Sequence, residues 1–79
     1  MKYTKKQIKD TVCQLVDMMG EYKGHKMSFN VDPESVYPFT VIFYRSSDKH
    51  CLLYNFYHRL SLRLNMEWLK EWMADNDLV

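Results

Sequence analysis

Three histidines and two cysteines are the residues of this chain whose side chains most readily bind metals or act as nucleophiles and bases. They are His25, His50, His58, Cys13 and Cys51. None of them forms a local pair at the spacing of zinc ligands, such as Cys-x-x-Cys. In one extended strand, Cys51 would point away from both His50 and His58. The sequence therefore predicts neither a metal site nor a Cys–His nucleophile.

Other signatures of catalysis are also missing from the sequence. Two glycines are too few for a loop that cradles phosphate. Closely spaced carboxylates occur only in the last helical segment, where a solvated charged face explains them. We therefore expect a protein that is not an enzyme, with no catalytic residues and no cofactor.

Length and composition indicate one compact domain over residues 1–79. Of these residues 47% are apolar and 15% are aromatic, which is enough for a small core. The formal net charge of +1 gives little bulk attraction to nucleic acid or to an anionic membrane. The chain lacks a membrane-length apolar run and a signal-peptide core. Two cysteines without a disulfide framework suit a reducing compartment, so we expect a cytoplasmic protein with two free thiols and no membrane partner.

The elements that would position these side chains are organised around residues 51–64, CLLYNFYHRLSLRL. Apart from His58, the even positions are apolar, whereas the odd positions are mixed. Because successive side chains of a strand alternate between faces, this pattern predicts a strand with an apolar inner face. A helix is the competing interpretation, because five large side chains recur every four residues. These are Leu52, Phe56, Leu60, Leu64 and Trp68.

The length of this stretch leaves the number of strands open. Fourteen residues exceed the usual strand, so we expect a bend or a bulge near His58. A reversal there would create a fourth strand. Asn65 is suited to cap the final helix, and the buried stripe of that helix is expected at Met66, Leu69, Trp72 and Met73.

The first half of the chain predicts one helix and two strands. Thr4 and Gln7 have the spacing of a capping box, and the helix is expected over residues 5–22, with Gly24 as its left-handed stop. Alternating apolar residues predict strands at 27–31 and 39–44. Polar residues 46–49 should join the second strand to the stretch 51–64 as a hairpin. An aromatic residue before proline leaves the isomer of the Tyr37–Pro38 bond open.

These elements predict an α+β fold. The order is an N-terminal helix, three or four antiparallel strands and a C-terminal helix, or αβββ(β)α. Each helix is apolar on one side, and the sheet has one strongly apolar face. A two-layer sandwich follows from these one-sided elements.

Protein binding is the function that this surface favours. Tyrosine, tryptophan, methionine and arginine are enriched at interface cores. We expect a stoichiometric inhibitor or adaptor of another protein, of the kind that phage or mobile elements direct at host enzymes. The expected binding residues are Trp68, Trp72, Glu67, Glu71, Asp75, Tyr44, Leu53 and Tyr57. A homodimer through the outer sheet face would use part of the same set.

Trp68 has two interpretations. It either anchors a basic partner within the rim of acids on the last helix, with Trp72 stacked behind it, or closes the edge of the core against Tyr3 or Tyr22.

Nucleic-acid binding is the alternative function. Tyrosines on the outer sheet face could stack on bases, and basic residues could contact phosphates. The candidate phosphate contacts are Arg59, Arg63, Lys5, Lys6 and Lys9. The order helix–three strands–helix is similar to that of double-stranded-RNA-binding domains. Those domains carry a lysine cluster where this chain has Asn65-Met66-Glu67, so the similarity is one of architecture only.

Overall fold

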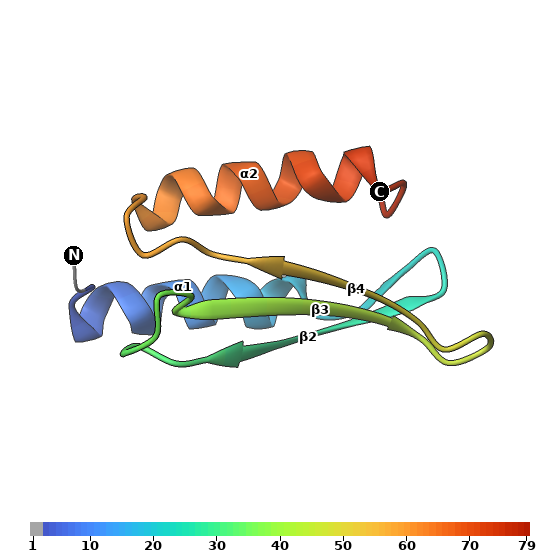
Figure 1. Cartoon of the computed structure of the whole chain (residues 1–79), viewed down its shortest axis with the longest axis horizontal. Helices are drawn as coiled ribbons and strands as arrows, with labels where there is room; N and C mark the ends of the chain where they lie inside the picture. The colour runs from blue at the N-terminus through green and yellow to red at the C-terminus, as the bar shows by residue number, and fades with distance from the viewer. Residues whose placement is uncertain (1–2) are drawn as a thin grey trace.

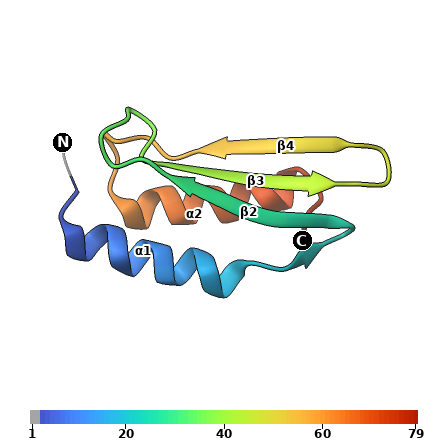
Figure 2. The ribbon, with the colours of Figure 1, turned by 90° about the horizontal axis from the view of Figure 1, so that it is seen from below.

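The computed structural model describes residues 3–79. In chain order they form α1 (Lys5–Met18), β1 (Glu21–Tyr22), β2 (His25–Val31), β3 (Phe39–Arg45), β4 (His50–Asn55) and α2 (Leu62–Asp75). The strands make one antiparallel sheet in the order β1-β2-β3-β4. Both helices lie against the same face of this sheet, and the other face carries no element (Figures 1 and 2). The predicted two-layer α+β sandwich is confirmed, with the antiparallel strands following an N-terminal helix and preceding a C-terminal helix along the chain.

The core lies between the sheet and the two helices. Phe39, Val41 and Phe43, the alternate residues of β3, are fully buried because β3 is an inner strand covered by helices on one face. Leu15 of α1 and Leu69 of α2 meet them with no exposed surface. Burial of this core stabilises the fold by about 25 cal/mol for each Å² of apolar surface removed from water.

Helix α1 begins as predicted and ends earlier than predicted. The Thr4 hydroxyl accepts a hydrogen bond from the Gln7 backbone N–H at 3.1 Å, and the Gln7 side chain accepts one from the Thr4 N–H at 2.8 Å. The helix ends at Met18, not at residue 22, so that prediction is wrong. Lys23 and Gly24 both have positive φ, at 49° and 89°, and form a tight hairpin between β1 and β2. Pairing with β2 thus outweighs helical periodicity for the last residues of the expected helix.

The stretch 51–64 is a strand only as far as Asn55. Its inner residues Leu52 and Tyr54 are half-buried and Phe56 is fully buried, as the alternation predicts. The chain then turns, and α2 begins at Leu62. The fourth strand is β1, which precedes β2 along the chain, and no reversal near His58 adds one among the described residues.

The cap of α2 also differs from the prediction. The Ser61 hydroxyl accepts a hydrogen bond from the Leu64 N–H at 3.1 Å, so Ser61 and not Asn65 is the N-cap. Asn65 lies one turn further on and is fully buried.

Three further features bear on the sequence-based expectations. Every peptide bond in residues 3–79 is trans, including Tyr37–Pro38. Cys13 and Cys51 are both free and exposed. Within the described part of the chain, neither helix has the length and apolar character needed to cross a bilayer.

Candidate partner-binding surface

Exposed apolar side chains gather where the loop between β2 and β3 meets the loop between β4 and α2. Val36, Tyr37 and Tyr57 are 58%, 42% and 49% exposed, which is high for such large side chains. The rings of Tyr37 and Tyr57 meet edge to face, with centroids 5.8 Å apart. With His58 and Arg59 these residues line a hollow of about 210 Å³. We call Val36, Tyr37 and Tyr57 the loop aromatic cluster.

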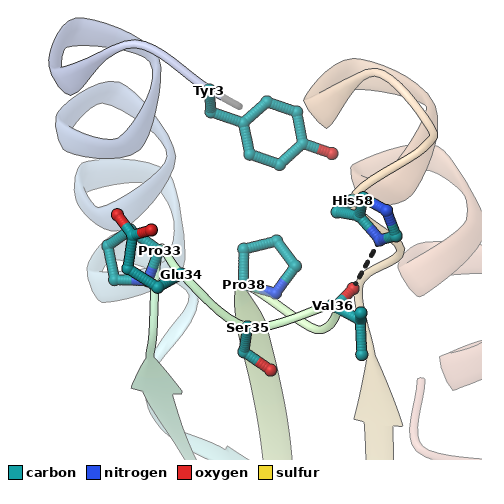
Figure 3. A pocket seen from close by; sticks show the side chains of 7 residues that line it. All are labelled: Tyr3, Pro33, Glu34, Ser35, Val36, Pro38 and His58. Carbon is teal, nitrogen blue, oxygen red and sulfur yellow. Dashed lines mark hydrogen bonds between the residues drawn. The ribbon is translucent and has the colours of Figure 1, made fainter. Parts of the chain in front are cut away.

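A second hollow of about 200 Å³ adjoins the first, and Val36 and His58 border both. Figure 3 shows that three separate segments enclose it: Tyr3 before α1, the loop with Pro33 and Pro38, and His58 before α2. The hollow is therefore a product of the tertiary fold and not of one loop.

His58 joins the two loops. Its backbone N–H donates to the Val36 carbonyl at 3.2 Å, and its ring Nδ1 lies 3.0 Å from the same oxygen (Figure 3). Since a carbonyl oxygen only accepts, the ring contact requires a proton on Nδ1. In the loop between β2 and β3, the Asp32 N–H donates to the Pro38 carbonyl at 2.9 Å. The loop aromatic cluster is thus held by backbone hydrogen bonds on both sides.

Asn65 fixes the loop between β4 and α2 from below. Its side-chain oxygen accepts from the Tyr57 N–H at 3.0 Å, and its amide donates to the Tyr57 and Ser61 carbonyls at 3.0 and 3.2 Å. These bonds satisfy backbone N–H and C=O groups of the loop, which lie outside the strands of the sheet. A fully buried asparagine is stable here because its polar atoms are paired.

Tyr3 adds a tie from the start of the chain. Its hydroxyl donates to the Tyr57 carbonyl at 2.9 Å and also contacts the Leu60 carbonyl. Burial raises the pKa of the Tyr3 hydroxyl, and its hydrogen bond with Asn65 partly offsets that rise. The phenol therefore stays protonated and keeps donating at neutral pH.

The outer sheet face is a second exposed area. Leu53 of β4 and Tyr44 of β3 are exposed, and half-buried Ile42 lies opposite Leu53. On β2 the same face is polar, with Lys26, Ser28 and Asn30 exposed. The apolar part of the outer face is therefore limited to β3 and β4.

The α2 residues expected at the site lie on the opposite side of the molecule from the outer sheet face. Trp68 is 41% exposed, which supports its interpretation as a surface residue. Trp72 does not stack behind it: its ring packs on Tyr54 and Phe43, at centroid distances of 5.3 and 5.7 Å. Glu67, Glu71 and Asp75 are all exposed, and Glu67 also lines a groove against α1. The expected binding residues of α2 and those of the outer sheet face thus lie on separate surfaces.

The basic residues of the alternative function are spread over three places. Arg59 lies beside the loop aromatic cluster, and Arg63 lines the groove between the two helices. Lys5 and Lys9, four residues apart, project from the side of α1 away from that groove, because helical residues repeat every 3.6 positions. Lys6 is exposed on α1 as well. No single stripe of cations results from this placement.

The residues considered for metal or nucleophilic chemistry are also dispersed. His25 and His50 meet at the far end of the sheet, with Nε2 and Nδ1 2.8 Å apart. In residues 3–79, no group of three or more histidine, cysteine, aspartate or glutamate side chains is placed to hold a metal ion.

Sequence reasoning missed Val36 and Tyr37. Both lie in the loop between β2 and β3, outside any strand. Two large apolar residues in a loop must either join the core or remain exposed, so their presence there could have indicated a binding surface.

The fold and these surfaces define a two-layer α+β sandwich with one uncovered sheet face. No protein-family model, no curated protein and no solved structure matches the chain.

Proposed function

We propose that this chain is a small, non-enzymatic protein-binding domain that acts stoichiometrically, as an inhibitor or an adaptor, in the cytoplasm. The observation that carries the proposal is the loop aromatic cluster: three large apolar side chains, each more than two-fifths exposed, beside a hollow and an arginine. Aromatic residues and arginine dominate the energetic centres of protein interfaces.

The rigidity of the cluster supports this function. Asn65, His58 and Tyr3 hold both loops by hydrogen bonds in the free protein. A preorganised surface loses little conformational entropy on binding, so more of the contact energy appears as affinity. Inhibitors of the kind that phage or mobile elements direct at host enzymes would benefit from such a surface.

The test is capture of a partner by the immobilised chain, followed by calorimetry with the purified pair. We expect a fixed ratio of the two proteins and no chemical conversion of the partner. Tyr37→Ala should weaken binding by about 2 kcal/mol or more. Val16→Ala, which truncates a similarly exposed apolar side chain on α1, is the control and should bind like the wild type.

Two outcomes contradict the proposal. Turnover of a substrate by the pure protein would make it an enzyme. Binding to RNA or DNA at low salt, with affinity that falls steeply as salt rises, would favour the nucleic-acid alternative.

A further inference from the structure

Strand β4 has an unpaired edge. It is the last strand of the sheet, and within residues 3–79 it pairs only with β3. The Phe56 N–H donates to the Phe39 carbonyl at 2.9 Å, which fixes the phase of the ladder. Because bonded and non-bonded positions alternate in an antiparallel pair, Leu52 and Tyr54 bond to β3. The backbone N–H and C=O groups of the alternate residues, Cys51, Leu53 and Asn55, therefore point away from β3.

This edge lacks the features that usually prevent pairing with another chain. Natural edge strands are blunted by lysine, proline, bulges or short length. The segment from His50 to Asn55 contains no lysine and no proline, and its register with β3 is unbroken. On the other edge, β1 pairs only with His25 and Lys26 of β2, so part of β2 lacks a strand partner as well. The residues of α2 beside β4 distinguish the β4 edge as the one suited to accept a strand.

The tryptophans of α2 lie on the same side of the molecule as this edge. Trp72 packs on Tyr54 of β4, and Trp68 precedes it by one helical turn. Arg63 and Lys70 line the groove against α1, on the other flank of the helix. Trp68 thus lies on the flank of α2 that faces away from α1, with 41% of its surface exposed.

The charge beside this edge is negative. Glu71 and Asp75 are exposed and follow Trp68 by three and seven residues, so they share its side of α2. Burial raises the pKa of the Tyr54 hydroxyl, and the charges of Tyr57 and Glu71 raise it further, which agrees with Glu71 lying near β4. The basic residues of α2 are on the opposite flank, so a positively charged ligand beside Trp68 would meet the acids of α2 and not its cations.

We propose that the partner supplies an extended segment that adds to the β4 edge as a further strand. Its backbone pairs with Cys51, Leu53 and Asn55, its apolar side chains pack against Trp68, and its lysines or arginines lie near Glu71 and Asp75. This inference rests on the proposed function and names the form of the partner's contact. The edge runs directly into Tyr57 of the loop aromatic cluster, so one partner can reach both areas.

A second copy of the chain fits this edge less well. Antiparallel pairing of two β4 strands about a two-fold axis keeps both copies of α2 on the same face, above the junction. Glu71 and Asp75 of one copy would then approach those of the other. A single extended segment brings no second helix and no second set of acids.

The test selects peptides from a random display library on the immobilised 79-residue chain, followed by synthesis of those that are enriched. We expect proline-free sequences that alternate apolar with basic residues. Adding such a peptide should slow amide hydrogen exchange at Cys51, Leu53 and Asn55. Leu52 and Tyr54, which already bond to β3, are the internal control and should change little. Enrichment of no peptide, or of peptides that leave these three amides unchanged, overturns the inference.

Charge reversal gives an independent check. Glu71→Lys should raise the dissociation constant of the selected peptide by about tenfold or more, whereas Glu21→Lys, the same change on β1 at the other edge of the sheet, should not. Equal effects of both variants would contradict the proposed contact. A captured protein partner that leaves the three edge amides unchanged would overturn the strand contact alone, while absence of any protein partner would overturn the proposed function.

Discussion

His25 and His50 connect two strands that are not neighbours in the sheet. His25 Nε2 and His50 Nδ1 lie 2.8 Å apart, across the position that Arg45 occupies on β3 between them. His25 is only 5% exposed, and its Nδ1 is buried with no hydrogen-bond partner in the described residues. An unpaired donor costs more when buried than an unpaired lone pair, so we assign the shared proton to His25 Nε2 and leave Nδ1 bare.

This contact should contribute to stability. His50→Ala removes the acceptor of a nearly buried donor, so it should lower the free energy of unfolding by about 1 kcal/mol. Urea unfolding of the wild type and the variant measures the difference; equal stability of the two proteins would contradict the assignment.

The two tryptophans of α2 should differ in their effect on stability. Trp72 packs against Phe43 and Tyr54, so Trp72→Ala should cost about 3 kcal/mol or more in unfolding free energy. Trp68→Ala should barely move the melting temperature and should instead cost about 2 kcal/mol in binding. Thermal melts of the two variants provide a matched comparison. A large loss of stability for Trp68→Ala would assign that side chain to the edge of the core.

Asn65 should matter more than the residue that caps the same helix. Asn65→Ala leaves the Tyr57 N–H without a partner and removes one of two bonds to the Tyr57 carbonyl, which should cost about 1–3 kcal/mol. Ser61→Ala removes one cap bond and should cost about 1 kcal/mol. Chemical denaturation of both variants gives the comparison. Asn65→Ala should also weaken partner binding, because the loop aromatic cluster loses its support; Ser61→Ala should leave binding unchanged.

Alkaline pH should unfold this protein partly through Tyr3. Burial raises the pKa of its hydroxyl in the folded state. An acid with a raised folded pKa contributes stability below its unfolded pKa, about 10, and that contribution is lost as pH rises through the folded value. Tyr3→Phe should lower stability by about 1 kcal/mol at neutral pH and remove this part of the alkaline decline. Tyr44→Phe, at an exposed tyrosine of the outer face, is the control.

The two-layer fold was predictable because each element carries its own periodicity. The alternation in residues 39–43 and 52–56 matches the buried and exposed sides of β3 and β4 closely. The capping box at Thr4 identified the start of α1 for a similarly local reason. Such signals depend only on residues that are close together along the chain, so they can be read from the sequence.

The errors arise where distant parts of the chain compete with local preference. Met19 fits the spacing of a helical stripe, yet it is about half exposed, because pairing of β1 with β2 ends α1 at Met18. Asn65 has a side chain suited to cap a helix, but it forms its hydrogen bonds with the backbone of the preceding loop. Neither outcome can be read from spacing, since each depends on which groups the tertiary fold leaves unpaired.

The candidate surface was only partly predictable for the same reason. Leu53 and Tyr57 were expected to be exposed, and they are. The loop aromatic cluster was not predictable, because the ring that contacts Tyr57 is Tyr37, which lies in a different loop twenty residues earlier in the chain. The α2 residues and the outer sheet face remain two separate candidate surfaces, because the helices cover the other face of the sheet (Figure 2).

The strand order β1-β2-β3-β4 has a consequence for the speed of folding. Every strand pairs with its neighbour in sequence, so the sheet can form from successive hairpins that each close a short loop. The contacts of longest sequence separation include the tie from Tyr3 to the loop before α2 and the ion pair of Lys23 with Asp77, and the docking of α2 adds the contact of Phe43 with Trp72. The barrier to folding should therefore lie mainly in bringing the two ends of the chain together over a sheet that is already assembled. Substitutions at Tyr3 should then alter the unfolding rate, and substitutions in the β3–β4 hairpin the folding rate.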